Sequence, residues 1–167
     1  MLFVCLGNHC RSPAAHAVAA AMSAHDRSIV IDSAGTSRAH VDDPAHPLAV
    51  AEGARRGYVL DHRGRQIHPD DFARFDLIVA MDQMNVDDLE RMRGGVEQRA
   101  GHYPTVEPVQ VQLLRRWDPY AMPGDEDLPD PWGRPAAAYG EMFDVIERTM
   151  PALLQHLRWL RSEHPPR

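Results

Sequence analysis

Near its start the chain reads Leu2-Phe3-Val4-Cys5-Leu6-Gly7-Asn8-His9-Cys10-Arg11-Ser12-Pro13, which places an apolar run, a glycine-containing loop and a proline in direct succession. The apolar run predicts a buried strand, and Pro13 suits the first turn of a helix, where its missing N–H costs nothing. The backbone N–H groups of the intervening loop would point inward, and the helix N-terminus would add partial positive charge. This order predicts a cradle for a phosphate, with a cysteine sulfur at its base.

Cys5 and Arg11 are the reactive pair of this stretch, six positions apart. The guanidinium of Arg11 is a planar, two-pronged donor that binds a phosphate dianion side-on. The loop dipoles and this guanidinium would stabilise a thiolate at Cys5, which is then equipped for phosphoryl transfer through a phosphocysteine. Free cysteines are more often small core hydrophobes. It is the combination with the strand, the loop and the helix start that favours the catalytic interpretation.

Length and composition predict one domain over residues 1–167. The formal net charge of −6 argues against nucleic-acid binding, which requires a basic face. No apolar stretch approaches the length of a membrane span and no signal-type leader is present, so we expect a cytoplasmic protein with no membrane partner; secretion without a signal stays open. The two cysteines suit a reducing compartment. The ten histidines show no metal-ligand spacing, so neither a metal nor another cofactor is expected.

Hydrophobic periodicity predicts strands and helices in alternation along the chain. The predicted strands span residues 2–5, 29–31, 75–81 and 109–114. The predicted helices span residues 13–25, 44–56, 83–93 and 141–161. Gly94 and Gly95 are expected to end the third helix, and Pro151 is expected to kink or break the fourth. Residues 115–135 hold five prolines and two glycines, which predicts a long irregular loop.

Strands that alternate with helices predict a parallel, doubly wound sheet. The ligands of such sheets bind beyond the carboxyl ends of the strands. Cys5 lies at one such end, Ser33 at a second and Asp82 just past a third. We therefore expect these three polar groups to converge at one edge of the sheet, with Asp82 serving as the N-cap of the helix that follows it.

Five segments of the chain resemble the low-molecular-weight protein tyrosine phosphatases. They are residues 2–13, quoted above, together with Asp32-Ser33-Ala34-Gly35-Thr36, Asp71-Phe72-Ala73-Arg74-Phe75-Asp76, Ala80-Met81-Asp82 and Asp130-Pro131-Trp132-Gly133. The resemblance runs in order over nearly the whole chain. It implies an α/β, flavodoxin-like three-layer fold with a four-stranded parallel sheet, of the phosphotyrosine protein phosphatase I type. It also implies metal-free hydrolysis of phosphotyrosine in a phosphorylated protein or peptide.

The resemblance further implies roles for individual residues. Cys5 would be the nucleophile, Arg11 the clamp on the equatorial phosphate oxygens, and Asp130 the general acid that later acts as base for water. The residues that would surround the substrate, or a bound phosphate or other oxyanion, are Leu6, Gly7, Asn8, His9, Cys10, Ser12 and Trp132. The residues that would hold the loop in shape are Asn8, Ser12, Ser33 and His62.

Three positions depart from the family pattern. His9 stands where relatives commonly carry an aliphatic or small residue, and it would lie at the mouth of the pocket. His16 replaces a glutamate, so the partner of His62 is altered. If the two histidines lie close together, they would resist double protonation and activity would fall at acidic pH. Ala39 replaces an aromatic wall of the substrate slot, which weakens the expected binding of phosphotyrosine.

Other functions stay open at this level. Protein arginine phosphatases share the motifs, and the missing aromatic wall favours a phosphorylated residue without a ring. A redox switch would form a sulfenic acid at Cys5 that Cys10 captures. A non-catalytic phosphate-binding module would need no acid, yet Asp130 is present in the matching local context. Thioredoxin-linked arsenate reductases need further cysteines, and none follows Cys10.

Overall fold

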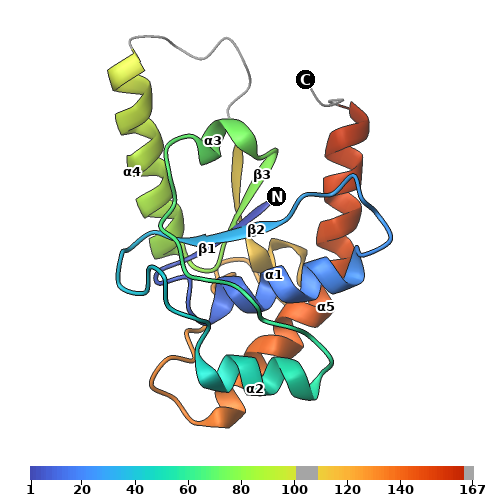
Figure 1. Ribbon diagram of the computed structural model, residues 1–167. Helices are drawn as coiled ribbons and strands as arrows, with labels where there is room; N and C mark the ends of the chain where they lie inside the picture. The colour runs from blue at the N-terminus through green and yellow to red at the C-terminus, as the bar shows by residue number, and fades with distance from the viewer. Residues whose placement is uncertain (101–108, 164–167) are drawn as a thin grey trace.

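The computed structural model describes residues 1–100 and 109–163, and at its centre lies a four-stranded parallel sheet (Figure 1). In chain order the strands are β1 (Leu2–Cys5), β2 (Asp32–Gly35), β3 (Leu77–Ala80) and β4 (Gln110–Leu113). They lie side by side in the order β2-β1-β3-β4, and all three pairings are parallel. The predicted α/β fold with a four-stranded parallel sheet is confirmed.

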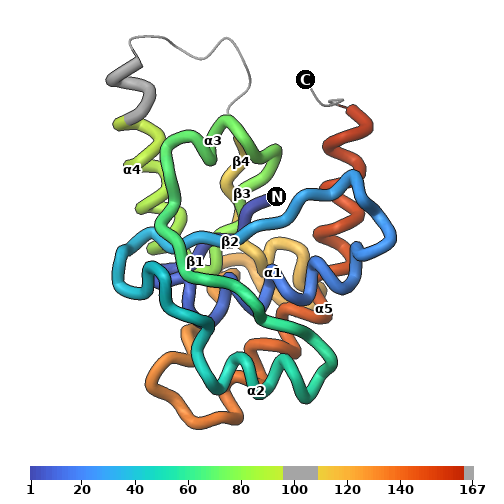
Figure 2. The backbone as a smooth tube through the Cα atoms, in the orientation of Figure 1, coloured from blue at the N-terminus to red at the C-terminus, as the bar shows by residue number. Residues whose placement is uncertain are grey.

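Helices cover both faces of this sheet and complete the three layers (Figures 1 and 2). Helices α1 and α5 pack against each other on one face, whereas α4 packs on the other against β3 and β4. The helices are α1 (Arg11–Met22), α2 (Pro47–Arg55), α3 (Asp71–Arg74), α4 (Gln83–Ala100), the short 3₁₀ helix η1 (Leu114–Trp117) and α5 (Ala136–Glu163). The short elements α3 and η1 were not predicted.

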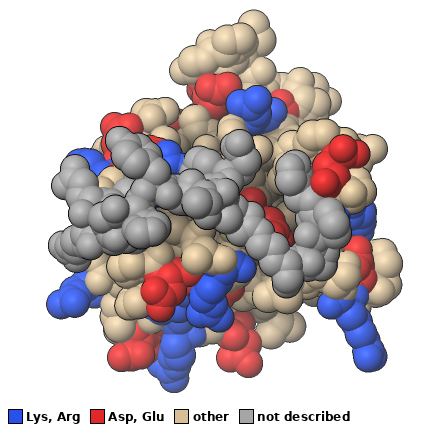
Figure 3. All heavy atoms as spheres, turned by 90° about the horizontal axis from the view of Figure 1, so that it is seen from above, with Lys and Arg blue, Asp and Glu red and all other residues tan. Residues whose placement is uncertain are grey.

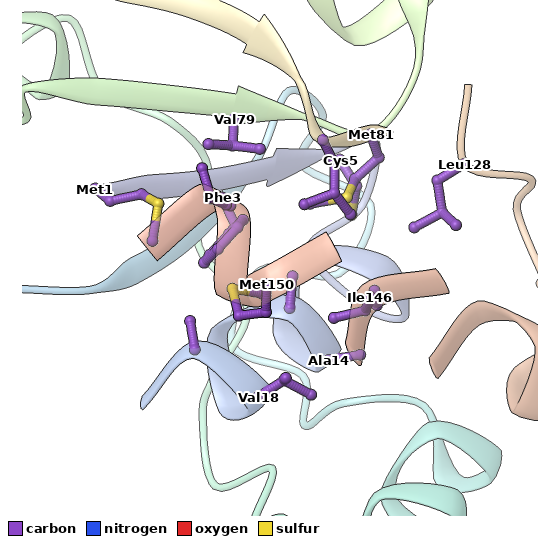
Figure 4. Close-up of a cluster of buried hydrophobic side chains, with 14 of the residues drawn as sticks. Met1, Phe3, Cys5, Ala14, Val18, Val79, Met81, Leu128, Ile146 and Met150 are labelled. Atoms are coloured by element: carbon purple, nitrogen blue, oxygen red, sulfur yellow. The ribbon is translucent and has the colours of Figure 1, made fainter. Parts of the chain in front are cut away.

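Alternate residues of each strand face the two helical layers, because successive side chains in a strand point to opposite sides. Phe3 packs with α1 and α5 in one buried cluster, whereas Ile78 packs in a second cluster on the α4 side. Both faces of the sheet are apolar, as expected where helices cover a parallel sheet. Cys5 belongs to the first cluster and lies at its edge with Met81 and Leu128 (Figure 4).

The second strand lies later in the chain than predicted. Residues 29–31 form no strand, and β2 begins at Asp32. Leu2, the first residue of β1, is in register with Asp32, so residues 29–31 extend past the start of β1 and have no neighbouring strand to pair with. Val30 is 69% exposed, and its carbonyl accepts a hydrogen bond from the Met1 amine at 2.8 Å. The prediction was wrong because an apolar triplet forms a strand only where a partner strand lies beside it.

Two helices run further than predicted. Helix α4 continues past Gly94 and Gly95 to Ala100. Neither glycine has a positive φ, so neither forms the left-handed C-cap that ends many helices. Helix α5 begins at Ala136 rather than at residue 141 and continues through Pro151, so the proline does not break it. Figure 1 shows that α5 bends along its length, as a proline inside a helix predicts.

Two other helices begin at different residues from those predicted. Helix α1 starts at Arg11, two residues before Pro13, and this places the guanidinium on the first helical turn. Helix α2 starts at Pro47, not at residue 44, because His46 serves as its N-cap and its side chain accepts a hydrogen bond from the Leu48 N–H at 3.2 Å. The first shift places Arg11 at a helix N-terminus, and the second places His46 at one.

Within residues 1–100 and 109–163, no helix is both long and apolar enough to cross a membrane. Acidic and basic side chains are interspersed on the face shown in Figure 3. The part of that face drawn in colour therefore carries no extended patch of like charge.

Candidate active site

In the loop between β1 and α1, residues 6–10, four of the five carbonyl groups are bonded to residues outside the loop. The carbonyl of Cys5 accepts a hydrogen bond from Thr36 N (2.9 Å), and that of Leu6 accepts one from Ser37 N (2.9 Å). Further along the loop, Asn8 O accepts from His62 Nε2 (3.1 Å), His9 O from His46 N (2.8 Å) and Cys10 O from Ala14 N (3.3 Å). In the part of the chain that the structure describes, no protein acceptor takes a hydrogen bond from the backbone N–H groups of residues 6–10. A loop with this polarity binds anions through its N–H groups.

Asn8 holds the loop in this shape. Its φ of 52° is left-handed, a region that asparagine tolerates better than most residues. Its side-chain nitrogen donates to Ser12 Oγ at 2.9 Å and Ser33 Oγ at 3.0 Å, and its side-chain oxygen accepts from the Arg65 N–H at 3.0 Å. With the bond from His62 to its carbonyl, Asn8 is fixed from four directions. The structure thus brings together the four residues that the resemblance grouped as loop support.

Cys5 lies beneath this loop, at the end of β1, and is 3% exposed. Its sulfur is 3.1 Å from Ser12 Oγ. The Ser12 hydroxyl oxygen already accepts a hydrogen bond from Asn8, so its own proton is directed to the sulfur or to the Ala34 carbonyl at 3.4 Å. A hydroxyl that donates to the sulfur stabilises the thiolate.

Arg11 is the buried cation of the site, 3% exposed. One terminal nitrogen donates to Asp82 Oδ2 at 2.6 Å and to the Leu128 carbonyl at 3.1 Å, and the other donates to Asp130 Oδ2 at 2.9 Å. Its Nε is buried and has no partner among the described residues. Burial opposes the charge, but Cys5, Asp130 and Asp82 outweigh it and raise the pKa of Arg11. Arg11 is therefore a fixed cation with two of its five N–H groups still free, that of Nε among them.

Asp82 has a second role beyond the predicted one. Its Oδ1 accepts a hydrogen bond from the Asn85 N–H at 2.8 Å, so it caps helix α4 as predicted. Its Oδ2 also holds the guanidinium of Arg11, which the sequence analysis missed. A single carboxylate thus fixes the clamp to the start of α4. The two residues are 71 positions apart, and no local pattern connects them.

Asp130 reaches the same edge from the loop that precedes α5. Its side chain is 42% exposed, and besides Arg11 it accepts a hydrogen bond from the Trp132 N–H at 3.1 Å. The Trp132 side chain is 63% exposed, and that of Leu6 is 46% exposed. The nucleophile, clamp and acid expected from the sequence therefore come together from three separate segments, with two exposed apolar side chains near the opening.

His16 and His62 contact the same support network from two sides. His16 Nδ1 lies 3.4 Å from Ser33 Oγ, and His62 Nε2 donates to the Asn8 carbonyl. His62 Nδ1 is buried and has no partner among the described residues. A proton on this nitrogen would therefore form a buried N–H group that has no hydrogen-bond acceptor. Burial lowers the pKa of both histidines, and the pKa of His16 is lowered further by His62. Both are therefore neutral at pH 7.

Acidification is expected to destabilise the fold because of these two histidines. In the unfolded chain their pKa is about 6.5, and burial lowers it in the native state. Below about pH 6.5 the unfolded chain binds more protons, so native stability is complete above this pH and is lost as the pH falls. Urea unfolding midpoints between pH 7.5 and pH 5 measure this slope. The double variant His16→Gln, His62→Gln should flatten it, and an unchanged slope would contradict the assignment.

His9 belongs to a second group of histidines, which the sequence analysis did not foresee. Its ring stacks on that of His40 with centroids 3.9 Å apart and planes 4° apart, and the ring of His46 lies edge-on at 5.2 Å. The His40 ring is so near Gly7 that a Cβ there would lie 2.9 Å from it. Burial, then neighbouring histidines, lower the pKa of His9 and of His46. A stack of imidazole rings therefore lies against the loop.

Cys10, the other cysteine of the loop, is buried and faces away from solvent. Burial raises the pKa of its thiol to about 12, and its sulfur lies 3.9 Å from the Tyr139 hydroxyl. Cys10 is consequently a protonated thiol at pH 7, unlike a reactive cysteine, which is held as thiolate. Its capture of an oxidised Cys5 stays a prediction.

Gly35 is a further residue that the site requires. A Cβ at this position would lie 2.9 Å from the Gly7 carbonyl carbon and from the Leu6 oxygen, so the end of β2 touches the phosphate loop directly. Only glycine allows this approach. The signal was present in the sequence, since Gly35 directly follows Ser33 and Ala34, but its steric role depends on two strands being neighbours.

The described residues form no arrangement of three or more His, Cys, Asp or Glu side chains that could hold a metal ion. The positive field at the loop comes from this chain's own groups. They are the uncommitted N–H groups, the N-terminus of α1 and the Arg11 guanidinium. Such a set is suited to a tetrahedral oxyanion.

Comparisons with known proteins agree with this geometry. The family described as low molecular weight phosphotyrosine protein phosphatase matches residues 1–162. A low molecular weight protein-tyrosine-phosphatase of Streptomyces coelicolor is 36% identical over 160 residues, 93% of this chain and 92% of that protein. A solved protein tyrosine phosphatase of Entamoeba histolytica has a TM-score of 0.81 at 28% identity, covering 95% of this chain and 96% of the other. A solved arginine phosphatase of Drosophila has a TM-score of 0.80 at 29% identity, covering 94% and 96%.

Proposed function

This chain belongs to the low molecular weight phosphotyrosine protein phosphatase family, and we propose that it hydrolyses phosphotyrosine in protein or peptide substrates. It is a phosphatase, and Cys5 is its proposed nucleophile. Arg11 is the proposed clamp on the phosphate, and Asp130 is the proposed general acid and base. The observation that carries this assignment is the polarity of the loop, in which the carbonyls of Leu6, Asn8, His9 and Cys10 are bonded to residues outside it while the N–H groups are uncommitted above Cys5.

Substrate binding would rearrange the contacts of Arg11. A phosphate over the loop can take the free Nε donor and compete with Asp130 for the terminal nitrogen that now holds it. Asp82 and the Leu128 carbonyl keep the other terminal nitrogen in place, so the guanidinium does not need to move. The Asp130 carboxyl group is then free to turn toward the leaving oxygen.

In the first chemical step the Cys5 thiolate attacks phosphorus and an S–P bond forms as the P–O bond to the phenol breaks. Protonated Asp130 gives its proton to the departing oxygen, so that phenol leaves instead of phenolate. The three equatorial oxygens carry the charge of a loose transition state, and the loop N–H groups and Arg11 face them.

In the second step water attacks the phosphocysteine. Asp130, now ionised, accepts a proton from this water, the S–P bond breaks, and Cys5 leaves as a thiolate to which Ser12 donates. Inorganic phosphate is released with Asp130 protonated again, so the enzyme returns to its starting state. Asp130 and water supply the protons of the two steps, and Cys5 and water supply the electron pairs that attack phosphorus.

Phosphoarginine hydrolysis is the second candidate function. It is supported by the similarity to the Drosophila arginine phosphatase and by the chain's own departures at the pocket, where Ala39 provides no ring. The nitrogen leaving group of phosphoarginine also gains from protonation by Asp130, so the mechanism alone does not separate the two substrates. The cytoplasmic location, the extent of the domain over 1–167 and the redox pairing of Cys5 with Cys10 stay predictions.

Turnover on three matched peptides distinguishes these functions. The peptides carry phosphotyrosine, phosphoarginine or phosphoserine at one position, and released phosphate is measured without added metal. We expect the highest kcat/KM on phosphotyrosine. Phosphate release from phosphoarginine alone would replace the tyrosine assignment with the second candidate. Phosphate binding without turnover on any peptide would show a binding module instead.

A further inference from the structure

We propose that Arg115 is a positioning residue that holds the loop carrying Asp130 in its working geometry. This inference rests on the proposed role of Asp130 as general acid. Arg115 lies on η1, is 8% exposed, and is one of the few buried charged residues outside the phosphate site in the described chain.

The guanidinium of Arg115 connects the beginning of this loop to its far end. Its Nε donates to Asp118 Oδ2 at 3.1 Å. One terminal nitrogen donates to the Asp127 carbonyl at 2.9 Å and to Asp125 at 3.3 Å, and the other also donates to Asp125 at 3.3 Å. The residues between Asp118 and Asp127 form no helix or strand, so this side chain supplies the cross-link that regular structure would otherwise provide.

The near end of the cross-link is itself anchored. Asp118 has a fully buried side chain and accepts two hydrogen bonds from Arg148 of helix α5, both at 2.8 Å. The bonds from Arg148, and then that from Arg115, lower the pKa of Asp118, so it stays charged. Arg115 therefore extends from a fixed point on the body of the protein.

The far end of the cross-link leads directly into the active site. The backbone carbonyl of Asp127 accepts a hydrogen bond from Arg115. The side-chain Oδ1 of Asp127 accepts the Gln83 N–H at the start of α4, at 2.8 Å. The next residue, Leu128, donates its N–H to the Met81 carbonyl at 2.7 Å and offers its own carbonyl to Arg11 at 3.1 Å. Asp130 follows two residues later. The path from Arg115 to the acid is thus short and bonded at each step up to Leu128.

Positioning of this kind affects one part of the reaction more than the rest. A general acid works only within about 2.6–3.2 Å of the atom it protonates, and a displacement of about 1 Å costs roughly a hundredfold in rate. Binding of phosphate depends mainly on the loop and on Arg11, which Asp82 also holds. Loss of Arg115 should therefore impair protonation of the leaving group more than binding.

The adjacent residue provides a matched control. Arg116 lies on the same short helix but is exposed, and its recorded hydrogen bond goes to the Gln112 side chain at 3.0 Å. Arg116→Gln removes the same charge one position away without touching the loop. A general electrostatic effect would appear in both variants, whereas a positioning effect appears only in Arg115→Gln.

The test measures kcat/KM, which reports formation of the phosphocysteine and not its hydrolysis, for phenyl phosphate, a poor leaving group, and 2,4-dinitrophenyl phosphate, a good one, together with inhibition by inorganic phosphate. We expect Arg115→Gln to lose about 10- to 100-fold on phenyl phosphate, and to change less than about threefold on the dinitrophenyl ester and in phosphate inhibition. Arg115→Lys should recover part of the loss. Arg116→Gln should match the parent on both esters. An equal loss on both esters, or no loss, would overturn the positioning role.

Two further variants separate the possible failures. If Arg115→Gln does not fold, Asp125→Asn removes only the exposed end of the cross-link, and we expect about a threefold loss confined to phenyl phosphate; a uniform loss or none would overturn the proposal. Asp130→Asn is run in parallel. If it shows no leaving-group dependence, the acid role in the proposed function fails. If it does and Arg115→Gln does not, only the positioning role fails.

Discussion

Replacing Cys5 with serine is expected to reduce kcat on an aryl phosphate by about 10⁴-fold or more, because a serine hydroxyl is not ionised near neutral pH and is a poor nucleophile without an adjacent base. Among the residues that the structure describes, the one side chain that hydrogen-bonds with the sulfur is Ser12, whose hydroxyl cannot act as such a base. The change is measured in steady state with p-nitrophenyl phosphate.

Binding of inorganic phosphate should survive this replacement. The loop N–H groups and Arg11 are unchanged by Cys5→Ser, and serine is close to cysteine in size. Calorimetric titration with phosphate should therefore give a dissociation constant within about threefold of the parent, since the anion is held by backbone dipoles and a guanidinium. Turnover within tenfold of the parent would mean that another residue is the nucleophile.

Asp130→Asn is expected to have the second largest effect. An amide cannot donate the proton that a departing phenol needs, and general acid catalysis typically contributes about 10²- to 10⁴-fold. We expect about a 10³-fold loss on phenyl phosphate and about a tenfold loss on 2,4-dinitrophenyl phosphate, whose leaving group needs little help. The two losses are compared as the rate constants for release of the phenol under single-turnover conditions.

A carboxylate in the same loop serves as control for Asp130. Glu126 makes no hydrogen bond with the other described residues, so Glu126→Gln removes one negative charge without altering the site. It should behave like the parent on both esters. Equal losses on the two esters in Asp130→Asn would exclude the acid role, and Asp130 would then act only by holding Arg11.

The phosphate loop could be predicted because its information is local. An apolar run, a loop with Gly7 and Asn8, and a helix start follow one another within twelve residues, although bonds with Ser33, His62 and Arg65 complete the shape of the loop. The left-handed backbone of Asn8 follows from the same stretch. The order of Cys5 and Arg11 along the chain is therefore local information, whereas the bonds that fix the guanidinium come from distant residues.

The elements predicted incorrectly depend on partners elsewhere in the chain. Residues 29–31 are apolar but lie past the start of β1, so sheet register and not composition decides where β2 begins. Helix α4 continues through two glycines because their cost, about 1 kcal/mol each relative to alanine, does not end a helix without a left-handed cap. Helix α5 keeps Pro151 because buried apolar residues on both sides of it, such as Ile146 before it and Leu154 after it, pack the helix onto the core.

The active site also contains contacts that depend on residues far apart in the chain. The pairing of Arg11 with Asp82, and the link from Arg115 to Asp127, join residues that no sequence pattern connects. The stack of His9 on His40 is a further example, since His9 was expected at the pocket mouth but its partner could not be identified from spacing. Long-range pairs of charged or aromatic side chains become evident only when the fold places their elements together.

Detection of a phosphoryl group on Cys5 tests the central claim most directly. The Asp130→Asn variant is mixed with 2,4-dinitrophenyl phosphate, quenched within milliseconds in alkaline denaturant, where an S–P bond survives, and digested for mass spectrometry. Because this variant should hydrolyse the intermediate slowly, we predict a phosphorylated peptide that contains Cys5 and forms at the rate of the dinitrophenol burst. A burst without any phosphorylated peptide, or a phosphoryl group on another residue, would contradict the account.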